Sequence, residues 1–223
     1  MLILLVLFLS CGFVADGVRA DSLSPAGENL RTFLISQAVE THWLPKSYIN
    51  WRTGDPIHPT DDEIQQKHLP FSSHCSDFVA AVSERLQITM LNPETSPDGH
   101  RLLANQQAIW LRSKQATELG WHEIALRDSE ALANQGQFVV ASEANPNPAK
   151  SGHIAVVVPD PDRSPEQIET LGPIIMQAGS PSSKVPSGNV LRTDTVSGFD
   201  HHDHGNLKLI RFYAHEIKAI PKI

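Results

Sequence analysis

The stretch SGHIAVVVP, residues 151–159, predicts a buried β-strand. Apolar residues fill both alternating sets of positions, with Ile154, Val156 and Val158 in one set and Ala155 and Val157 in the other. Because successive side chains of a strand point to opposite faces of the sheet, this strand must be covered on both sides. His153 stands at its entrance, where the sheet holds a polar side chain rigidly.

Four more runs in the second half of the chain have β-strand character, and Pro, Gly, Asn and Ser fill the gaps between them. They are WHEIAL, GQFVVAS, GPIIMQAG and NLKLIRFYAHEI. The first half instead shows helical spacing, with helices expected over residues 24–43, 60–68, from 72 or 73 to 86, and within 98–119. Helices followed by an antiparallel sheet of about five strands describe an α+β domain.

Local signals mark where these helices begin and end. Ser24 with Pro25 suits a helix start, and Thr60 with Glu63 has the spacing of a capping box. Gly120 is expected to cap the C-terminal end of the helix within residues 98–119. Between the first two helices, LPKSYINWRTGDPIHP is expected to form an ordered loop.

The first 20 residues, MLILLVLFLSCGFVADGVRA, predict a secretory signal peptide. Lipidation at Cys11 is the competing interpretation. The apolar run is too short for a membrane helix, so no integral membrane segment is expected after cleavage. We therefore expect an exported, periplasmic or extracellular protein. Residues 21–223 would form a single domain, with 21–69 as a helical extension that shapes its groove.

Composition excludes some functions and singles out one cysteine. The net charge is -7 and the basic residues are scattered, so no nucleic-acid footprint is present. Nothing in the chain indicates an oligomeric state. Without the leader, Cys75 is the one cysteine, so an internal disulfide is impossible. A lone thiol in an oxidising compartment is either a small core residue or a functional group.

Cys75 is predicted in the first turn of a helix, in the stretch FSSHCSDFVAAVSERL. Cys75, Val79, Val82 and Leu86 follow at steps of four, three and four, so they share the face that packs on the fold. Unpaired N–H groups and the positive end of the helix dipole favour a thiolate there and can stabilise an oxyanion. Packing alone does not separate a nucleophile from a core residue.

His153 is the best candidate for a base, because a strand entrance holds an imidazole rigidly. Gln177, in GPIIMQAGS on the next apolar strand, can accept a hydrogen bond from the ring N–H and so orient it. Asp160 and Asp162 could also orient the ring, but PDPDRSP more naturally forms a turn, so they rank below Gln177.

The blocks HCSDFVAAV, EALANQGQFVVAS, SGHIAVVVP and IIMQAGS, in this order, resemble the NlpC and CHAP cell-wall amidases and peptidases. The resemblance covers roughly residues 72–180, and Cys75, Gly136, His153 and Gln177 match the family's positions. It implies a papain-like core and a cysteine hydrolase that cleaves an amide bond in peptidoglycan stem peptides, with no cofactor. The peptidoglycan peptide would be its partner.

The resemblance also makes Tyr48, His74 and Ser76 candidates to contact substrate or the oxyanion. Tyr48 would correspond to the family's tyrosine upstream of the nucleophile. Two residues depart from the family pattern: His74 replaces an acidic or amide residue, and Gln137 replaces the Asp that commonly follows Gly136.

The run FDHHDHGN gathers the densest group of polar side chains. His201, His202 and His204 could bind zinc or nickel, but a solvated loop is the simpler interpretation, because no second ligand group with zinc-site spacing exists. Two other functions therefore stay open: a metal-binding exported protein, and a catalytically silent module that binds the cell wall or a partner.

Overall fold

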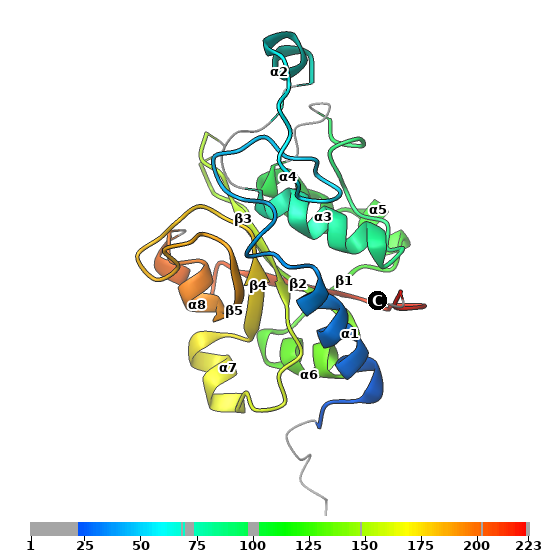
Figure 1. Cartoon of the computed structure of the whole chain (residues 1–223). Helices are drawn as coiled ribbons and strands as arrows, with labels where there is room; N and C mark the ends of the chain where they lie inside the picture. Colours follow the sequence, from blue (N-terminus) through cyan, green and yellow to red (C-terminus); the bar gives the residue numbers. More distant parts are fainter. Residues whose placement is uncertain are drawn as a thin grey trace, which may run out of the picture.

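The computed structural model describes residues 22–67, 69, 74–97, 103–147, 149–201 and 203–221. One antiparallel sheet of six strands crosses this part of the chain in the order β1-β6-β2-β3-β4-β5, and helices pack on it (Figure 1). The strands are β1 His122–Ile124, β2 Phe138–Glu143, β3 His153–Val157, β4 Ile174–Gln177, β5 Val190–Asp194 and β6 Arg211–His215. The α+β prediction is confirmed.

The sheet contains one strand more than the sequence indicated. β5 pairs antiparallel with β4, and none of its five residues is fully buried. Its sequence VLRTD mixes apolar and charged side chains, so it lacks the apolar run that identified the other strands. β5 lies at the edge of the sheet, where exposure to solvent is ordinary.

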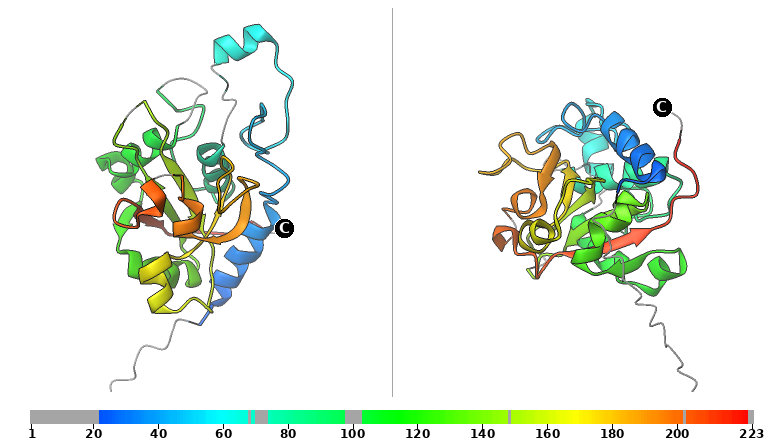
Figure 2. Two further views of the ribbon diagram at one scale, coloured as in Figure 1. Left: turned by 90° about the vertical axis from the view of Figure 1, so that its left-hand side faces the viewer. Right: turned by 90° about the horizontal axis from the view of Figure 1, so that it is seen from below.

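β3 lies inside the sheet, between β2 and β4, and is buried over its whole length. Its two alternating sets belong to two separate cores, as the sequence predicted. Ile154 and Val156 join the larger core with α1, α3 and α4, whereas Ala155 and Val157 join a second core with α6. Figure 2 shows the sheet between these helical layers.

The helices lie in both halves of the chain. They are α1 Pro25–Ser36, α2 Asp61–Lys67, α3 Cys75–Arg85, α4 Ala104–Leu111, α5 Lys114–Glu118, α6 Ser129–Asn134, α7 Pro165–Leu171 and α8 Thr195–Gly198. In the described residues two short 3-10 segments, η1 Leu126–Asp128 and η2 Asp203–Gly205, accompany them. The short helices α6, α7 and α8 were not predicted.

α1 begins where the sequence placed it but ends earlier. The Ser24 side chain accepts a hydrogen bond from the Gly27 N–H at 3.0 Å, so Ser24 is the N-cap. The predicted helix over residues 24–43 is wrong in its last part, because α1 stops at Ser36 and Ala38 takes a positive φ of 50°. Val39 and Trp43 are nevertheless fully buried, from a loop that folds back on the core.

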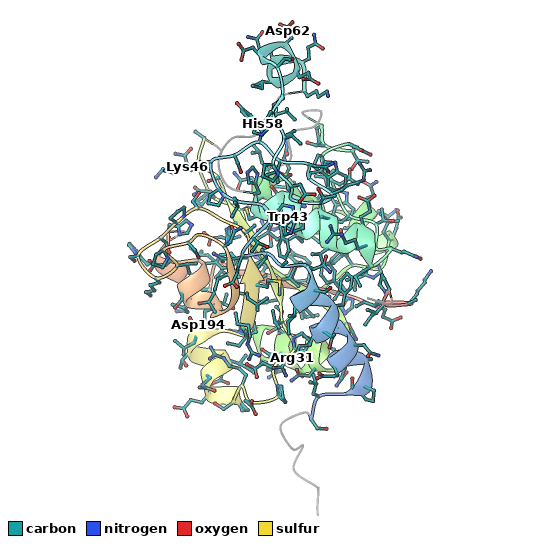
Figure 3. The ribbon with its side chains drawn as sticks, viewed as in Figure 1. Arg31, Trp43, Lys46, His58, Asp62 and Asp194 are labelled. Carbon is teal, nitrogen blue, oxygen red and sulfur yellow. The ribbon has the colours of Figure 1, made fainter. Side chains whose placement is uncertain are left out.

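α2 stands away from the rest of the molecule. Its predicted capping box is present: the Thr60 N–H donates to the Glu63 carboxylate at 2.9 Å, and the Glu63 N–H donates to the Thr60 hydroxyl at 3.3 Å. None of its residues is buried. Figure 3 shows Asp62 at the tip of this projecting segment and His58 nearer the body. The predicted end at His68 lies outside the described residues.

Two further helix boundaries differ from prediction. α3 begins at Cys75, later than the expected start at Ser72 or Ser73, two positions that lie outside the described residues. The helix expected within 98–119 is two helices, because the Ser113 hydroxyl accepts from the Ala116 N–H at 3.2 Å and starts α5. Gly120, expected as its cap, follows the end of α5 with φ 101°.

The described part of the 21–69 extension packs on the body at α1. Leu30 and Leu34 are fully buried in the larger core, and the Ser24 N–H donates to the Asn134 carbonyl at 3.0 Å. The predicted signal peptide, including Cys11, lies outside the described residues. Of the helices in the described ranges, none has the length and apolar character to cross a membrane.

Candidate active site

Four buried polar side chains gather at one end of the sheet. β2 ends there at Glu143 and β4 at Gln177, while β3 begins at His153 and β5 follows directly after Asn189. Because β2, β3, β4 and β5 are successively antiparallel, these four residues share one edge of the fold. Their exposed fractions are 0 to 2 %. Buried polar groups of this kind need partners, and the partners define the geometry.

Gln177 fixes the imidazole of His153. The His153 Nε2 lies 2.9 Å from the Gln177 Oε1, and the Gln177 Nε2 donates to the Gly188 carbonyl at 3.3 Å. A carbonyl only accepts, so the amide nitrogen must face Gly188 and the amide oxygen must face the ring. The ring therefore donates from Nε2, and in neutral imidazole the basic lone pair belongs to Nδ1.

Glycines allow the amide and the ring to pack this closely. A Cβ at Gly198 would lie 2.7 Å from the Gln177 Oε1 and 2.4 Å from the Ile175 side chain. Gly188 has a φ of +79°, and a Cβ there would lie 2.2 Å from the Gly179 carbonyl. On its other side the imidazole meets the Phe199 ring edge-on, with 4.6 Å between ring centroids.

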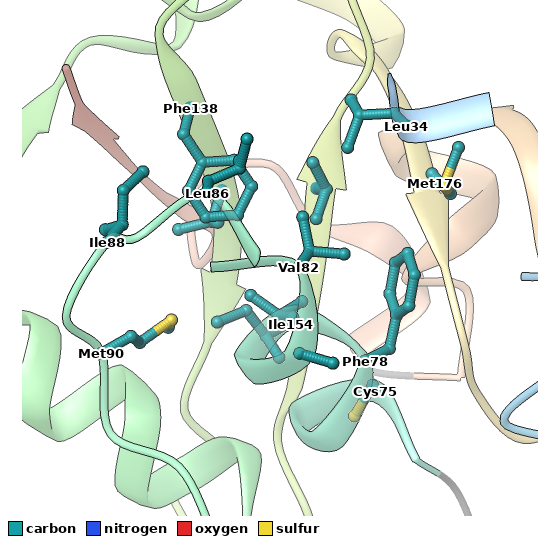
Figure 4. Close-up of a cluster of buried hydrophobic side chains, with 14 of the residues drawn as sticks. Leu34, Cys75, Phe78, Val82, Leu86, Ile88, Met90, Phe138, Ile154 and Met176 are labelled. Carbon is teal, nitrogen blue, oxygen red and sulfur yellow. The ribbon is translucent and has the colours of Figure 1, made fainter. Parts of the chain in front are cut away.

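Cys75 is the first residue of α3, the helix that packs on β3. α3 packs along β3, and Cys75 shares the larger core with Ile154, the residue after His153. Figure 4 shows Cys75 at the first turn of α3 and Ile154 on β3 within this core. The cysteine is 4 % exposed. Packing therefore brings the start of α3 to the larger-core face of β3, near its first residues.

His74, the N-cap residue of α3, has its side chain turned away from the helix. It makes no cap hydrogen bond, and its Nε2 donates to the Ser47 carbonyl at 2.9 Å. Its side chain is fully buried, and its Nδ1 lies 3.4 Å from the Asp77 Oδ2. Burial raises the pKa of Asp77, and the contact with His74 opposes that rise. His74 thus anchors α3 to the loop before it.

The other two candidates for substrate contact lie near this anchor. Tyr48 follows Ser47 directly and is half-buried, so the bond from His74 brings its loop to the N-terminal end of α3. Ser76 is buried in the first turn, where its backbone carbonyl accepts from the Gln107 side chain at 3.1 Å.

Asn189 holds the loop after α1 against the loop that carries Gly188. Its Nδ2 lies 2.8 Å from the Val39 carbonyl and 2.7 Å from the His42 carbonyl, and its Oδ1 accepts from the Gly179 N–H at 3.1 Å. Trp43 in the same loop packs edge-on against Phe78 of α3. One short segment therefore contacts both α3 and the loop beside Gln177.

The histidine-rich run lies beside this end of the sheet. His201 has its ring centroid 6.1 Å from that of His153, His204 is exposed with a φ of 57°, and His202 lies outside the described residues. Within the described ranges, no group of three or more His, Cys, Asp or Glu side chains is placed to hold a metal ion.

The competing aspartates lie elsewhere. Asp160 pairs with Arg192 at 2.5 Å, and its Oδ1 accepts from the Asp162 N–H at 3.1 Å, so PDPDRSP forms the expected turn. Gln177, in contrast, contacts the imidazole directly.

Sequence reasoning missed Glu143 and Asn189. Glu143 is directly opposite His153 in the pairing of β2 with β3, so both side chains leave the same face of the sheet. The signal for Glu143 was its place at the end of a buried strand. For Asn189 no local signal exists, because its partners lie about 150 residues earlier.

Compared with models of known protein families, the chain matches none, and a comparison with curated proteins also finds no match.

Proposed function

We propose that the protein is an exported cysteine hydrolase that cleaves an amide bond in peptidoglycan stem peptides. One observation carries the proposal: the buried His153 is held by Gln177 in the tautomer that gives Nδ1 the basic lone pair. A rigid base of known tautomer, at the end of the sheet where α3 begins with a cysteine, is the arrangement that a thiol nucleophile needs.

The position of Cys75 supports the role of nucleophile. The first N–H groups of a helix have no partner within the helix, and the dipole places positive charge there. His74 is the N-cap residue of α3, but its side chain bonds to the Ser47 carbonyl. The N-cap side chain therefore does not accept from the first N–H groups of the helix. Such an environment favours the thiolate, which is the reactive form of cysteine.

The reaction follows from these roles. The His153 Nδ1 takes the thiol proton as the Cys75 Sγ forms a bond to the amide carbon, and the carbonyl oxygen becomes an oxyanion. The Cys75 backbone N–H is one donor to that oxyanion. The C–N bond then breaks as the imidazolium protonates the leaving amine, which gives a thioester. A water molecule, deprotonated by His153, hydrolyses the thioester and restores the thiol.

The choice of substrate rests on the sequence. Four blocks in one order resemble the NlpC and CHAP enzymes, and the first 20 residues have the character of an export signal. The observed α+β fold, with a cysteine helix packed on an antiparallel sheet, is consistent with a papain-like core.

Digestion of purified sacculi tests the proposal. Wild-type protein should release peptide fragments with new amine termini, detected by mass spectrometry, and Cys75→Ala should release none. His153→Gln should be at least about 100-fold slower, because a general base contributes 10²-fold or more. His122→Gln is the matched control, since this exposed histidine lies on the opposite edge strand β1.

Two outcomes would count against hydrolysis. Equal release by wild type and Cys75→Ala would exclude the thiol, provided that circular dichroism shows both to be folded. Sacculi that are bound but not cut would favour the silent binding module. Alkylation by iodoacetamide gives an independent measure: near neutral pH the thiol of wild type should react at least about tenfold faster than that of His153→Gln.

A further inference from the structure

A polar pocket of about 410 Å³ opens at His153. Asn145, Lys150 and Ser151 line it from the loop between β2 and β3, and Ser180 and His201 line it from the segments after β4 and α8. Its lining is mostly hydrogen-bonding groups, which suits a hydrophilic ligand and not an apolar side chain.

The wall that carries Lys150 is held in place by α4. The Asn105 side chain donates to the Lys150 carbonyl at 2.8 Å and accepts from the Asn145 N–H at 2.8 Å. A Cβ at Gly152 would lie 2.5 Å from the same Asn105 oxygen, so the loop closes tightly over this side chain. The backbone at Lys150 therefore has a defined position relative to His153.

The pocket has a cation on its wall and no acidic group among its lining residues. The Lys150 side chain is exposed and pairs with no carboxylate of the described residues. Asp200, next to His201, is already engaged by Ser183 at 2.7 Å and Lys184 at 3.3 Å. Burial lowers the pKa of His201, which leaves Lys150 as the charge of the pocket.

We propose that this pocket binds a carboxylate of the peptide substrate beside the scissile amide, with the Lys150 ammonium as its ionic partner. Ser151 and Ser180 supply the surrounding hydrogen bonds. The chain as a whole carries a charge of -7, so its net charge repels an acidic peptide, whereas the Lys150 ammonium attracts a carboxylate locally. The inference rests on the proposed function, because it assigns His153 as the catalytic base.

Binding to full-length Cys75→Ala protein tests the pocket without turnover. The probes are two forms of one N-acetylated stem tripeptide, L-alanyl-γ-D-glutamyl-L-lysine, with both carboxylates present or both replaced by carboxamides. Isothermal titration calorimetry should give a Kd about tenfold lower for the carboxylate form, as one charge-assisted contact provides. Adding Lys150→Met should bring the two Kd values within about twofold, whereas Lys150→Arg should keep the preference.

Lys114→Met is the matched control, because it removes the same charge from an exposed lysine of α5. It should leave the preference intact. The proposal is overturned if the two probes bind equally, if the carboxylate probe does not bind, if Lys150→Met keeps the preference, or if Lys114→Met removes it. Cleavage of sacculi together with any of these results would leave the hydrolase standing without the pocket. If the protein prefers the carboxylate probe but does not cleave sacculi, the pocket would stand and the proposed hydrolase would fail.

Discussion

The Gln177 Oε1 lies 2.9 Å from the His153 Nε2, and Gly188 fixes which end of the amide faces the ring. This relationship separates two roles for Gln177, accepting from the imidazole and holding the loop. Gln177→Ala removes both, and under the proposed function we expect its kcat to fall about 100-fold because the imidazole loses its orientation.

Gln177→Glu keeps the acceptor but cannot donate to Gly188. It should therefore retain more activity than Gln177→Ala, and its pH–rate profile should move to higher pH because a carboxylate beside the ring favours the protonated imidazole. Rates measured from pH 5 to 9 check this. Equal loss in both variants, with no shift of the profile, would show that Gln177 acts only through the loop.

Asn189→Ala should lower the free energy of unfolding by about 2 to 4 kcal/mol, since it removes the partner of the Val39 and His42 carbonyls and of the Gly179 N–H at once. Asn189→Asp is a more specific test of the bonds from the Asn189 amide nitrogen, because it keeps the shape of the side chain. Three backbone carbonyls around Nδ2 favour the protonated acid in the folded state, so the folded pKa is expected to lie above the unfolded value near 4. This variant should then lose stability as pH rises from 5 to 8.

Asn147→Asp is the control for that experiment, because its exposed side chain only accepts, from the Ala149 N–H at 3.0 Å. Urea unfolding at pH 5 and pH 8 measures both variants against wild type. If the free energies of unfolding of Asn189→Asp and Asn147→Asp change equally with pH, the bonds from the Asn189 amide nitrogen do not determine the stability of the loop.

His74→Ala should cost about 2 to 4 kcal/mol of stability, because it removes the bond to Ser47 and leaves the buried Asp77 alone. In the double variant with Asp77→Asn the loss should be smaller than the sum of the two single losses. Chemical denaturation of the four proteins gives the coupling. His58→Ala, at an exposed position, should change stability little. Strict additivity would mean that His74 and Asp77 do not interact.

Glu130 predicts a pH dependence of the fold itself. Its two carboxylate oxygens accept from the Asp160 and Ile174 N–H groups at 2.8 and 3.1 Å, yet burial raises its pKa to about 8. The folded state thus binds the proton more tightly than the unfolded chain, whose pKa is near 4.5. Stability from this group is complete below pH 4.5 and is lost as pH rises through 8.

Between pH 5 and 8 wild type should therefore lose about 2 to 4 kcal/mol relative to Glu130→Gln, which does not titrate. Glu169→Gln, an exposed residue of α7, should follow wild type. A constant difference between wild type and Glu130→Gln across this range would contradict the expectation.

The parts of the fold that could be predicted are those with a strong local signal. β3 followed from its continuous apolar run, the start of α1 from Ser24, and the start of α2 from the Thr60 and Glu63 pair. The end of α1 could not be predicted, because Val39 and Trp43 kept a helical spacing while packing from a loop. Tertiary burial overrode the local pattern there.

The candidate site divides in the same way. Cys75 at a helix start and His153 at a strand start are local features, and Gln177 followed from its place on the next apolar strand. The bonds of Gln177 to Gly188, of His74 to Ser47, and of Asn189 to the loop after α1 depend on how distant segments meet. Periodicity and capping signals carry no information about such pairs.

The bonds that join Asn189 to the loop after α1 also determine how early in synthesis the candidate site can be assembled. Val39 and Asn189 are separated by 150 residues, and contacts across so long a stretch of chain are costly to close and tend to form late. During synthesis the thiol leaves the ribosome well before His153, Gln177 and Asn189. A nascent or C-terminally shortened chain would therefore carry the nucleophile without an oriented base, and under the proposed function it would be inert.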